Sequence, residues 1–542
     1  MMKEKYKCKK EQTLYEAILT SATRYPNRVA LRYFHKPFTY RHLIRRINQF
    51  AFALKGMGVN KDEPVTICLP NTPDAVYLLY AVNQIGAIAN IVHPLFTYEQ
   101  MDENLSMING KILFCLDTRY DLFKPLIKKG VKIIACSPSG ELPLIKRFVY
   151  KRRVKDKIKD IPSDDFVSKF YAFPRSLEYD TDFKKDSLYL HSGGTSGKSK
   201  TIALSSFSLN ALCYNSAWIT GFDTFVNKGM MAVLPMFHGF GLCMGIHAYL
   251  AHGGYDVLIP KFSRKDTIKY IKRGQLSILI GVPVLYEALL SKRNFRGRKL
   301  RSINIAFVGG DYVSPALMER FNIRMEKSGS ICRLREGYGL TETVNVCTVN
   351  THFHYKPGTV GKMLPNVIAK VLDEKGNELP FDTEGEICIG GETIMNGYRF
   401  SEDKDINKKS FYIDKDGNKY VKTGDFGSLD SDGFITFKTR LKRIVKVNGI
   451  PVFPSMIEDA ATSFNFVFEV CAIGVEDPKR GHIIKLFVVL SKSYKGTKEE
   501  AISKLNERIV SRLGVYSKPK EIIFMDKLPH TPIGKIDYKL LQ

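Results

Sequence analysis

The chain has 542 residues, of which 44% are hydrophobic, so it can build several cores, and we expect two to four domains. Its 82 Lys and Arg outnumber 55 Asp and Glu; such a surface attracts nucleic acid, anionic membranes or polyanionic metabolites, unless the lysine excess is only a bias of composition. The sequence contains neither paired zinc ligands nor a basic strand rich in aromatic residues, so no nucleic-acid-binding module is predicted. Its ten cysteines are scattered and its first residues do not resemble a signal peptide, which predicts a cytoplasmic protein with reduced thiols.

Helical and strand patterns alternate over residues 11–110. Residues 40–54 carry apolar side chains at helical spacing, whereas residues 65–69 and 88–92 are short apolar runs typical of buried strands. A turn with two prolines at residues 70–73 precedes an apolar helix that ends near Gly86. Strands that alternate with helices predict a largely parallel α/β sheet.

Residues 144–160 interrupt this alternation. They contain eight Lys or Arg against two Asp, with six apolar residues among them. If this segment is helical, it is a basic amphipathic helix that could lie on an anionic membrane surface. The alternative is a solvated, lysine-rich surface insertion, which explains the same composition.

A glycine-rich loop follows the apolar residues 188–190. Its glycines allow backbone amides to point inward, and its hydroxyls and lysines suit a polyphosphate. A Walker A loop needs a glycine where Ser192 stands, and a flexible surface loop does not explain the placed lysines. We therefore predict a phosphate-binding loop made of Ser192, Gly193, Gly194, Thr195, Ser196, Gly197, Lys198 and Lys200.

The remaining chain divides into three patterns. The α/β alternation resumes over residues 204–335, and within it the uncharged residues 229–255, long enough to span a bilayer, contain a proline and many glycines and read as core. Short strands separated by Asp-Gly turns occupy residues 367–437, and a new αβ pattern begins after Arg440. We predict an α/β fold with a large N-terminal domain, residues 1–439, that includes a β-rich subdomain at about 367–437, and a small mobile α+β domain, residues 440–542.

Several short motifs follow the loop in a fixed order. Each one alone is more often structural than functional. They are Phe237-His238-Gly239-Phe240, Gly309-Gly310-Asp311, Tyr338-Gly339-Leu340-Thr341-Glu342, Thr423-Gly424-Asp425, Arg440-Leu441-Lys442 and Gly534-Lys535. Taken together and in this order, they resemble the adenylate-forming superfamily, which includes acyl-CoA synthetases, peptide-synthetase adenylation domains and firefly-luciferase-like enzymes.

The resemblance covers nearly the whole chain and implies a role for each motif. It makes Lys535, Glu342, Thr195 and His238 catalytic, and Glu342 with Ser192 the ligands of Mg²⁺. It assigns an acyl pocket to Phe237, His238, Gly239, Phe240, Gly309 and Val344, and a hinge to Lys442. Nucleotide contacts beyond the loop fall on Gly310, Asp311, Tyr338, Gly339, Thr341, Asp425, Arg440, Lys446 and Gly449.

The activity that the resemblance implies is ATP-dependent activation of a carboxylic acid to an acyl-adenylate, followed by transfer to CoA, in an AMP-forming acid–thiol ligase. His238 stands where amino-acid-activating relatives have an aspartate, so an amino acid is not the expected substrate. The His-Gly-Phe-Gly gate resembles that of fatty-acyl or luciferase-like members, and together with the possible membrane-surface segment it makes a medium- or long-chain fatty acid the expected substrate. An aryl acid remains an alternative, as does a carrier-protein phosphopantetheine in place of CoA. The non-enzymatic alternative is an inactive acyl- or nucleotide-binding relative. The expected location is cytoplasmic, with a peripheral contact at the inner membrane face through residues 144–160.

Overall fold

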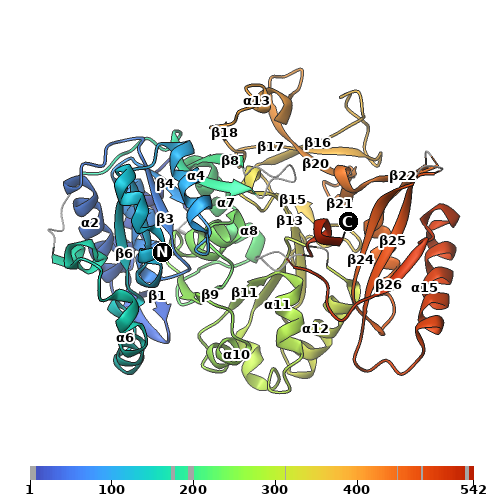
Figure 1. Cartoon of the computed structure of the whole chain (residues 1–542), viewed down its shortest axis with the longest axis horizontal. Coiled ribbons are helices and arrows are strands. Elements are labelled where there is room, and N and C mark those ends of the chain that lie inside the picture. Colours follow the sequence, from blue (N-terminus) through green and yellow to red (C-terminus); the bar gives the residue numbers. More distant parts are fainter. Residues whose placement is uncertain are drawn as a thin grey trace, which may run out of the picture.

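A computed structural model describes residues 8–172, 178–192, 200–311, 313–448, 450–477, 480–530 and 536–541. Figure 1 shows the blue and green N-terminal layers on the left, the orange β-rich part at the top and the red C-terminal region on the right. The large α/β part, its β-rich portion and a smaller C-terminal α+β part confirm the predicted fold class.

The glycine-rich loop belongs to a seven-stranded sheet of the described residues, in the order β18-β8-β7-β4-β3-β5-β6. Strands β4, β3, β5, β6 and β7 are parallel neighbours, whereas β8 pairs antiparallel with both β7 and β18. The strands are β3 (Pro64–Cys68), β4 (Ile88–Ile91), β5 (Ile112–Leu116), β6 (Lys132–Cys136), β7 (Asp186–Ser192), β8 (Lys200–Ser205) and β18 (Gly397–Arg399).

A second sheet of the described chain has the order β15-β14-β13-β12-β11-β9-β10-β1-β2 and is parallel from β13 to β1. Its strands are β1 (Val29–Tyr33), β2 (Lys36–Thr39), β9 (Gly229–Ala232), β10 (Tyr255–Leu258), β11 (Ile278–Gly281), β12 (Ile305–Val308), β13 (Leu334–Tyr338), β14 (Thr348–Val349) and β15 (Lys362–Met363). The parallel pairing predicted from residues 11–110 is confirmed, but the strands of this stretch belong to two sheets, β1 and β2 to the second and β3 and β4 to the first.

Helix α3 (Pro73–Gln84) shows how the sequence builds the layer beside these sheets. Thr72 caps its N-terminus by accepting a hydrogen bond from the Ala75 amide, and Pro73 occupies the first turn, where no amide donor is needed. Every residue of α3 is buried, and its polar residues include Asp74, which accepts from the Tyr171 hydroxyl, and Asn83, which donates to the Ser206 hydroxyl.

The other helices of the large part are α1 (Leu14–Arg24), α2 (Tyr40–Gly56), α4 (Tyr98–Ile108), α5 (Tyr120–Phe123), α6 (Leu144–Ile158), α7 (Ser206–Tyr214), α8 (Ser216–Thr220), a π-helix (Phe240–His247), α9 (Ala248–Leu250), α10 (Arg264–Lys272), α11 (Pro283–Leu290) and α12 (Pro315–Lys327). The uncharged residues 229–255 form β9, a turn, the π-helix and β10, and nearly all of them are buried in the core, as predicted. No helix in the described ranges combines the length and apolarity needed to cross a bilayer.

The β-rich part contains β16 (Val367–Leu372), β17 (Gly385–Gly391), β19 (Phe411–Ile413), β20 (Lys419–Leu429), β21 (Ile435–Arg440) and the short α13 (Ile406–Ser410). Asp373, Asp414 and Asp430 each accept backbone hydrogen bonds in the predicted turns. The C-terminal part consists of β22 (Val445–Val447), β23 (Ile450–Val452), α14 (Pro454–Thr462), β24 (Val467–Asp477), β25 (Gly481–Leu490), α15 (Lys498–Leu513) and β26 (Glu521–Phe524), with its own apolar core.

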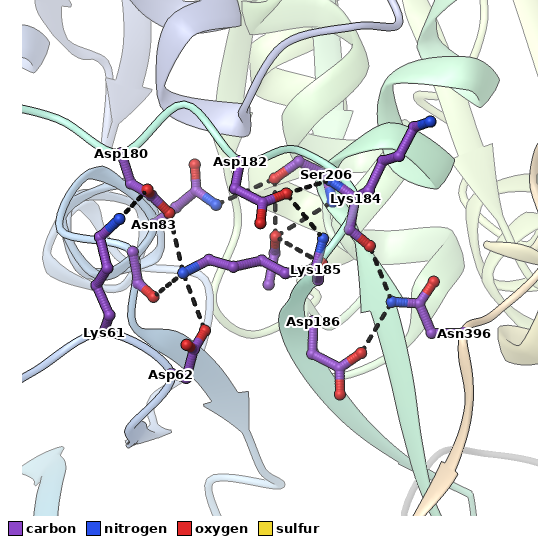
Figure 2. A network of polar contacts seen from close by, with 12 residues as sticks. Lys61, Asp62, Asn83, Asp180, Asp182, Lys184, Lys185, Asp186, Ser206 and Asn396 are labelled. Atoms are coloured by element: carbon purple, nitrogen blue, oxygen red, sulfur yellow. Dashed lines mark hydrogen bonds and ion pairs between the residues drawn. The ribbon is translucent and has the colours of Figure 1, made fainter.

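An ionic network fixes the segment that leads into β7. Figure 2 shows Lys185 between Asp180 and Asp62, with Nζ 2.9 Å from each carboxylate and donating to the Gly86 carbonyl at 2.7 Å. Lys61 reaches the other oxygen of Asp180 at 2.6 Å. Because Asp180 is buried, these contacts replace its lost hydration and hold the entry to β7, and so to the glycine-rich loop, against β3 and α3.

Candidate functional site

Glu342 lies at the meeting point of three chain segments. It follows β13 in a short 3₁₀ turn, Thr341–Thr343, and its Oε1 accepts a hydrogen bond from the Tyr398 hydroxyl at 2.8 Å. Tyr398 comes from β18, which pairs with β8, and Nζ of Lys200 at the start of β8 lies 4.8 Å from the Tyr398 ring centroid. The backbone amide of Met395 donates to the Glu342 carbonyl. The last lysine of the glycine-rich loop therefore stands next to the predicted metal-binding carboxylate.

A second carboxylate, Asp425, is held by the last residue of β13. The Tyr338 hydroxyl donates to Asp425 Oδ2 at 2.6 Å, and Arg440 Nε lies 2.8 Å from Oδ1 as an ion pair. Burial raises the pKa of Asp425, with the Glu342 charge adding to the rise, while Arg440 and the Tyr338 hydroxyl oppose it. Tyr338, which holds Asp425, ends β13, and Glu342 lies in the turn that follows it, so both carboxylates belong to the same end of this strand.

Asp425 Oδ1 is occupied by Arg440, whose Nε lies 2.8 Å away as an ion pair. Apart from this ion pair, Oδ1 has no hydrogen-bond partner within the described residues. The Asp425 side chain is fully covered, whereas about half of the Arg440 side chain is exposed. If Arg440 moved, Oδ1 would be left as an acceptor for a polar ligand.

Glycines line a narrow apolar cavity of about 20 Å³ beside these carboxylates. A Cβ on Gly309 would lie 2.6 Å from the Gly337 carbonyl oxygen, and one on Gly339 would overlap the Asn345 carbonyl, so neither position tolerates a side chain. The lining residues are Ile219, Phe240, Met244, Ile280, Phe307, Val308, Gly309, Gly310, Gly337, Gly339, Asn345, Val346 and Val349.

The predicted acyl-pocket residues divide into two groups. Phe240 and Gly309 line the cavity, whereas Phe237, His238, Gly239 and Val344 do not. Phe237 is buried between the His238 and His93 rings, at centroid distances of 4.6 and 4.5 Å, and burial lowers the pKa of His93. Val344 is fully buried in the left-handed turn after Glu342, with φ of 58°, and a Cβ on Gly239 would lie 3.4 Å from the Asn345 Cβ. Gly239 and Val344 therefore pack next to the turn that carries Glu342, and Phe237 and His238 lie beside Gly239 in the chain.

The glycine-rich loop itself lies outside the described residues from Gly193 to Ser199, as do the predicted site residues Gly449 and Lys535. The two strands that carry the loop are linked below it, where His191 Nδ1 and the Thr201 hydroxyl lie 3.3 Å apart. His191 Nε2 lies 2.6 Å from Asn90 Oδ1 on β4, and burial lowers the pKa of His191 to about 4. A neutral imidazole therefore ties the base of the loop to the sheet.

The remaining predicted residues occupy the surroundings. Asp311 follows β12 and is exposed, Thr341 is half-buried beside Glu342, and Lys442 is exposed in the 3₁₀ turn Leu441–Arg443 between β21 and β22. Lys446 is exposed on β22. The described contacts do not join Lys446 to the two carboxylates.

Sequence reasoning missed three residues as members of the site. Tyr398 lies in none of the predicted motifs, and His191 immediately precedes the loop. Phe437 of β21 lies against Tyr338, with ring centroids 5.9 Å apart. Position next to a predicted loop could have pointed to His191, but no local signal places Phe437 or Tyr398 beside residues so distant in the chain.

The arrangement combines carboxylates that suit a hard cation, a buried acceptor that suits a hydroxyl, and an apolar slot next to both. Comparison with known proteins identifies a family of nucleotide-binding enzymes, in agreement with these groups. The AMP-binding enzyme model matches residues 18–399, and the model of the AMP-binding enzyme C-terminal domain matches residues 456–535.

Relatives match over almost the full chain. A long-chain-fatty-acid–CoA ligase of Bacillus subtilis (strain 168) is 28% identical over 550 residues, covering 97% of this chain and 93% of the relative. A probable 4-coumarate–CoA ligase 3 of Dictyostelium discoideum is 26% identical over 522 residues, covering 94% and 90%. The ATP-bound MatB from Rhodopseudomonas palustris shares the fold with a TM-score of 0.83 at 22% identity, covering 97% of this chain and 98% of that one. Since the first family model spans well over half of the sequence, the chain belongs to the AMP-binding enzyme family.

Proposed function

We propose that this chain is an AMP-forming acid–thiol ligase, which activates a carboxylic acid with ATP and then transfers the acyl group to the thiol of CoA. The observation that carries the proposal is the placement of Asp425 and Glu342 at the end of β13, with Tyr338 and Arg440 on the first carboxylate and Tyr398 and Lys200 next to the second. The relatives named above are CoA ligases, which supports the same activity for this chain.

The nucleotide fits the residues that surround Asp425. Ribose hydroxyls would donate to the carboxylate once Arg440 moves aside, and the base would lie beside Tyr338. An added Cβ on Gly339 would collide with the backbone, so a glycine is required there. The phosphates would then extend toward the loop that ends at Lys200.

Charge neutralisation is the main task in this reaction, because a carboxylate attacks the α-phosphorus of a polyanion. Glu342, with Ser192 as second ligand, would hold Mg²⁺, which neutralises phosphate charge when bound. Tyr398 holds the Glu342 carboxylate in place, and Lys200 adds a cation on the same side. Lys198 and Thr195 of the loop would hold the departing pyrophosphate, and Lys535 would bridge the attacking carboxylate and the α-phosphate.

The acyl group would occupy the apolar cavity lined by Phe240, Met244 and Val346. Its lining favours an apolar acid, and we propose a medium- or long-chain fatty acid, with an aryl acid as the alternative. The cavity of about 20 Å³ holds little more than one water molecule, so substrate binding requires lining side chains to move. His238 stands at the wall of this region, where it would face the reacting carboxylate.

Thioester formation needs a rearrangement in which Lys535 leaves the adenylate and the thiol enters. We place the boundary at residues 439 and 440 and the hinge at Lys442, which is exposed between β21 and β22, while the C-terminal part has its own core. Lys446 and Gly449 would contact the nucleotide in one of the two arrangements. The acceptor is CoA in this proposal, and a carrier-protein phosphopantetheine is the alternative. We place the enzyme in the cytoplasm, with peripheral contact at the inner membrane face.

One experiment tests the activity directly. The protein is incubated with ATP, Mg²⁺, CoA and a panel of fatty and aryl acids, and AMP and thioesters are measured by mass spectrometry. In parallel, Lys535→Ala should slow adenylation by about 10²–10³-fold, the size of the loss of one preorganised transition-state donor. The same variant should still form thioester from supplied acyl-adenylate. Absence of AMP with every acid would refute the ligase, and equal damage to both half-reactions would refute the role of Lys535.

A further inference from the structure

Helix α6 presents an apolar stripe to solvent. Leu144 and Ile145 are 81% and 82% exposed, and Phe148 and Val149 are 69% and 54% exposed. The four residues follow one another at helical spacing, so they share one outward face over the first two turns. Four large apolar side chains exposed together on one helix are unusual for a surface that meets only water.

The opposite face of α6 is fixed to the protein. The Tyr150 hydroxyl donates to Asp117 Oδ1 at 2.5 Å, and Val154 is only 5% exposed. At the side of the helix, Lys146 Nζ lies 4.4 Å from the centroid of the Phe34 ring. The helix is therefore packed against the protein through this face. Its apolar stripe points outward because the opposite face makes these contacts.

Cations surround and continue the stripe. Helix α6 contains seven Lys or Arg and one Asp. Arg152 continues the row of Leu144 and Phe148 one turn further on, with Lys151 and Lys155 beside it, and all three are exposed. Asp156, also exposed, lies on the same face four residues after Arg152 and is the one acidic residue of α6. The outward face is thus apolar in its first half and carries a net positive charge in its second.

We propose that α6 docks the protein on an anionic lipid bilayer, with Leu144, Ile145, Phe148 and Val149 inserted at the level of the head groups and the basic second half against lipid phosphates. An interfacial helix combines these two properties. Nucleic acid would use the cations but not the apolar stripe. Figure 1 shows α6 at the opposite end of the molecule from α15. This surface lies outside the proposed catalytic site and adds a partner to the proposed function.

Vesicle co-sedimentation tests the docking. We expect the full chain to bind vesicles of phosphatidylcholine with phosphatidylglycerol and not vesicles of phosphatidylcholine alone. A charge variant with Lys151→Glu, Arg152→Glu and Lys155→Glu should lose at least about tenfold in binding. The matched control makes the same charge change on α15, with Lys504→Glu, Arg508→Glu and Arg512→Glu, and should bind far better than the charge variant.

Two more variants separate insertion from attraction alone. Ile145→Ser with Phe148→Ser keeps every charge and should weaken binding several-fold, most clearly in high salt, where screening leaves the apolar contribution. Phe148→Trp adds a second tryptophan to Trp218, and its emission should shift to the blue with anionic vesicles. Equal sedimentation with neutral and anionic vesicles, equal loss in the α15 control, or no effect of the serine variant together with tight binding to duplex DNA would overturn the proposal.

Enzymatic activity gives an independent readout. The charge variant should lose turnover of a long-chain acid supplied in anionic vesicles and keep turnover of a short soluble acid. Vesicle binding by a protein without ligase activity would refute the proposed function and leave the docking surface standing. Full activity on vesicle-borne acid in a charge variant that no longer binds would show that the contact does not deliver substrate.

Discussion

Replacement of Asp425 by Asn removes one charge from the proposed ribose site with almost no change of shape. Asn still offers a carbonyl oxygen to the Tyr338 hydroxyl, which now donates to Asp425 at 2.6 Å. Burial raises the pKa of Asp425, so its charged form is costly in the free protein, and Arg440 is exposed enough to regain water. We expect the free energy of unfolding to change by no more than about 0.5–1.5 kcal/mol, the net value of one hydrogen bond.

ATP binding should suffer more than stability. A hydrogen bond to a charged acceptor contributes about 1.5–3 kcal/mol, against about 1 kcal/mol for a neutral one. Two ribose hydroxyls would therefore lose about 1–4 kcal/mol together, which corresponds to an increase in Kd for ATP of about fivefold to several hundredfold. Isothermal titration calorimetry measures Kd, and urea unfolding measures stability.

The matched control for this experiment is Asp430→Asn. Asp430 lies in the turn between β20 and β21, where it accepts from the Phe434 amide and pairs with Lys356 at 2.6 Å. Its replacement should leave Kd for ATP unchanged. If Asp425→Asn unfolds more easily but binds ATP as tightly as the parent protein, Asp425 is a structural ion-pair residue and the nucleotide lies elsewhere.

Three further variants test other parts of the structure. Tyr398→Phe removes the hydroxyl that holds Glu342, so the Mg²⁺ concentration for half-maximal turnover should rise by about 10–100-fold, and an unchanged metal response would contradict the contact. Asp180→Ala breaks a buried ionic network and should lower the free energy of unfolding by about 3 kcal/mol, whereas Lys61→Met at an exposed position should cost less than about 1 kcal/mol; equal effects would refute the network's importance. Burial, and after it the charge of Asp459, raises the pKa of Glu336 to about 8. The protonated Glu336 therefore contributes to the free energy of unfolding below the pKa of the unfolded chain, and this contribution is lost as pH rises through 8. Glu336→Gln should accordingly be more stable than the parent protein at pH about 9 but not near pH 4, which urea unfolding midpoints would show.

Local sequence determined the elements of this protein. Residues 40–54 predicted α2, and the turn at residues 70–73 predicted the start of α3, because capping and apolar spacing act within a few residues of the chain. The Asp-Gly turns predicted the hairpins of the β-rich part for the same reason. The order of the short motifs predicted the family, since it needs no knowledge of which strands pair.

Tertiary structure alone decided how these elements meet. Residue patterns predicted a largely parallel α/β sheet over residues 11–110 but not which strands pair, and the strands of this stretch divide between two sheets because the choice of partner depends on packing across distant segments. The pairing of β18 with β8 brings Tyr398 beside Lys200 and Glu342, and the pairing of β20 with β21 brings Arg440 to Asp425. Neither contact has a local signal in the chain.

Helix α6 shows both contributions in one segment. The sequence determined its composition, basic with scattered apolar residues, and left open whether it is an amphipathic helix or a solvated insertion. The structure decided that it is a helix and which apolar residues face water: Val154 and Tyr150 turn inward toward Asp117, and this leaves Ile145 and Phe148 outside. A helix has several faces that can pack, and only the groups on the neighbouring elements select which one does.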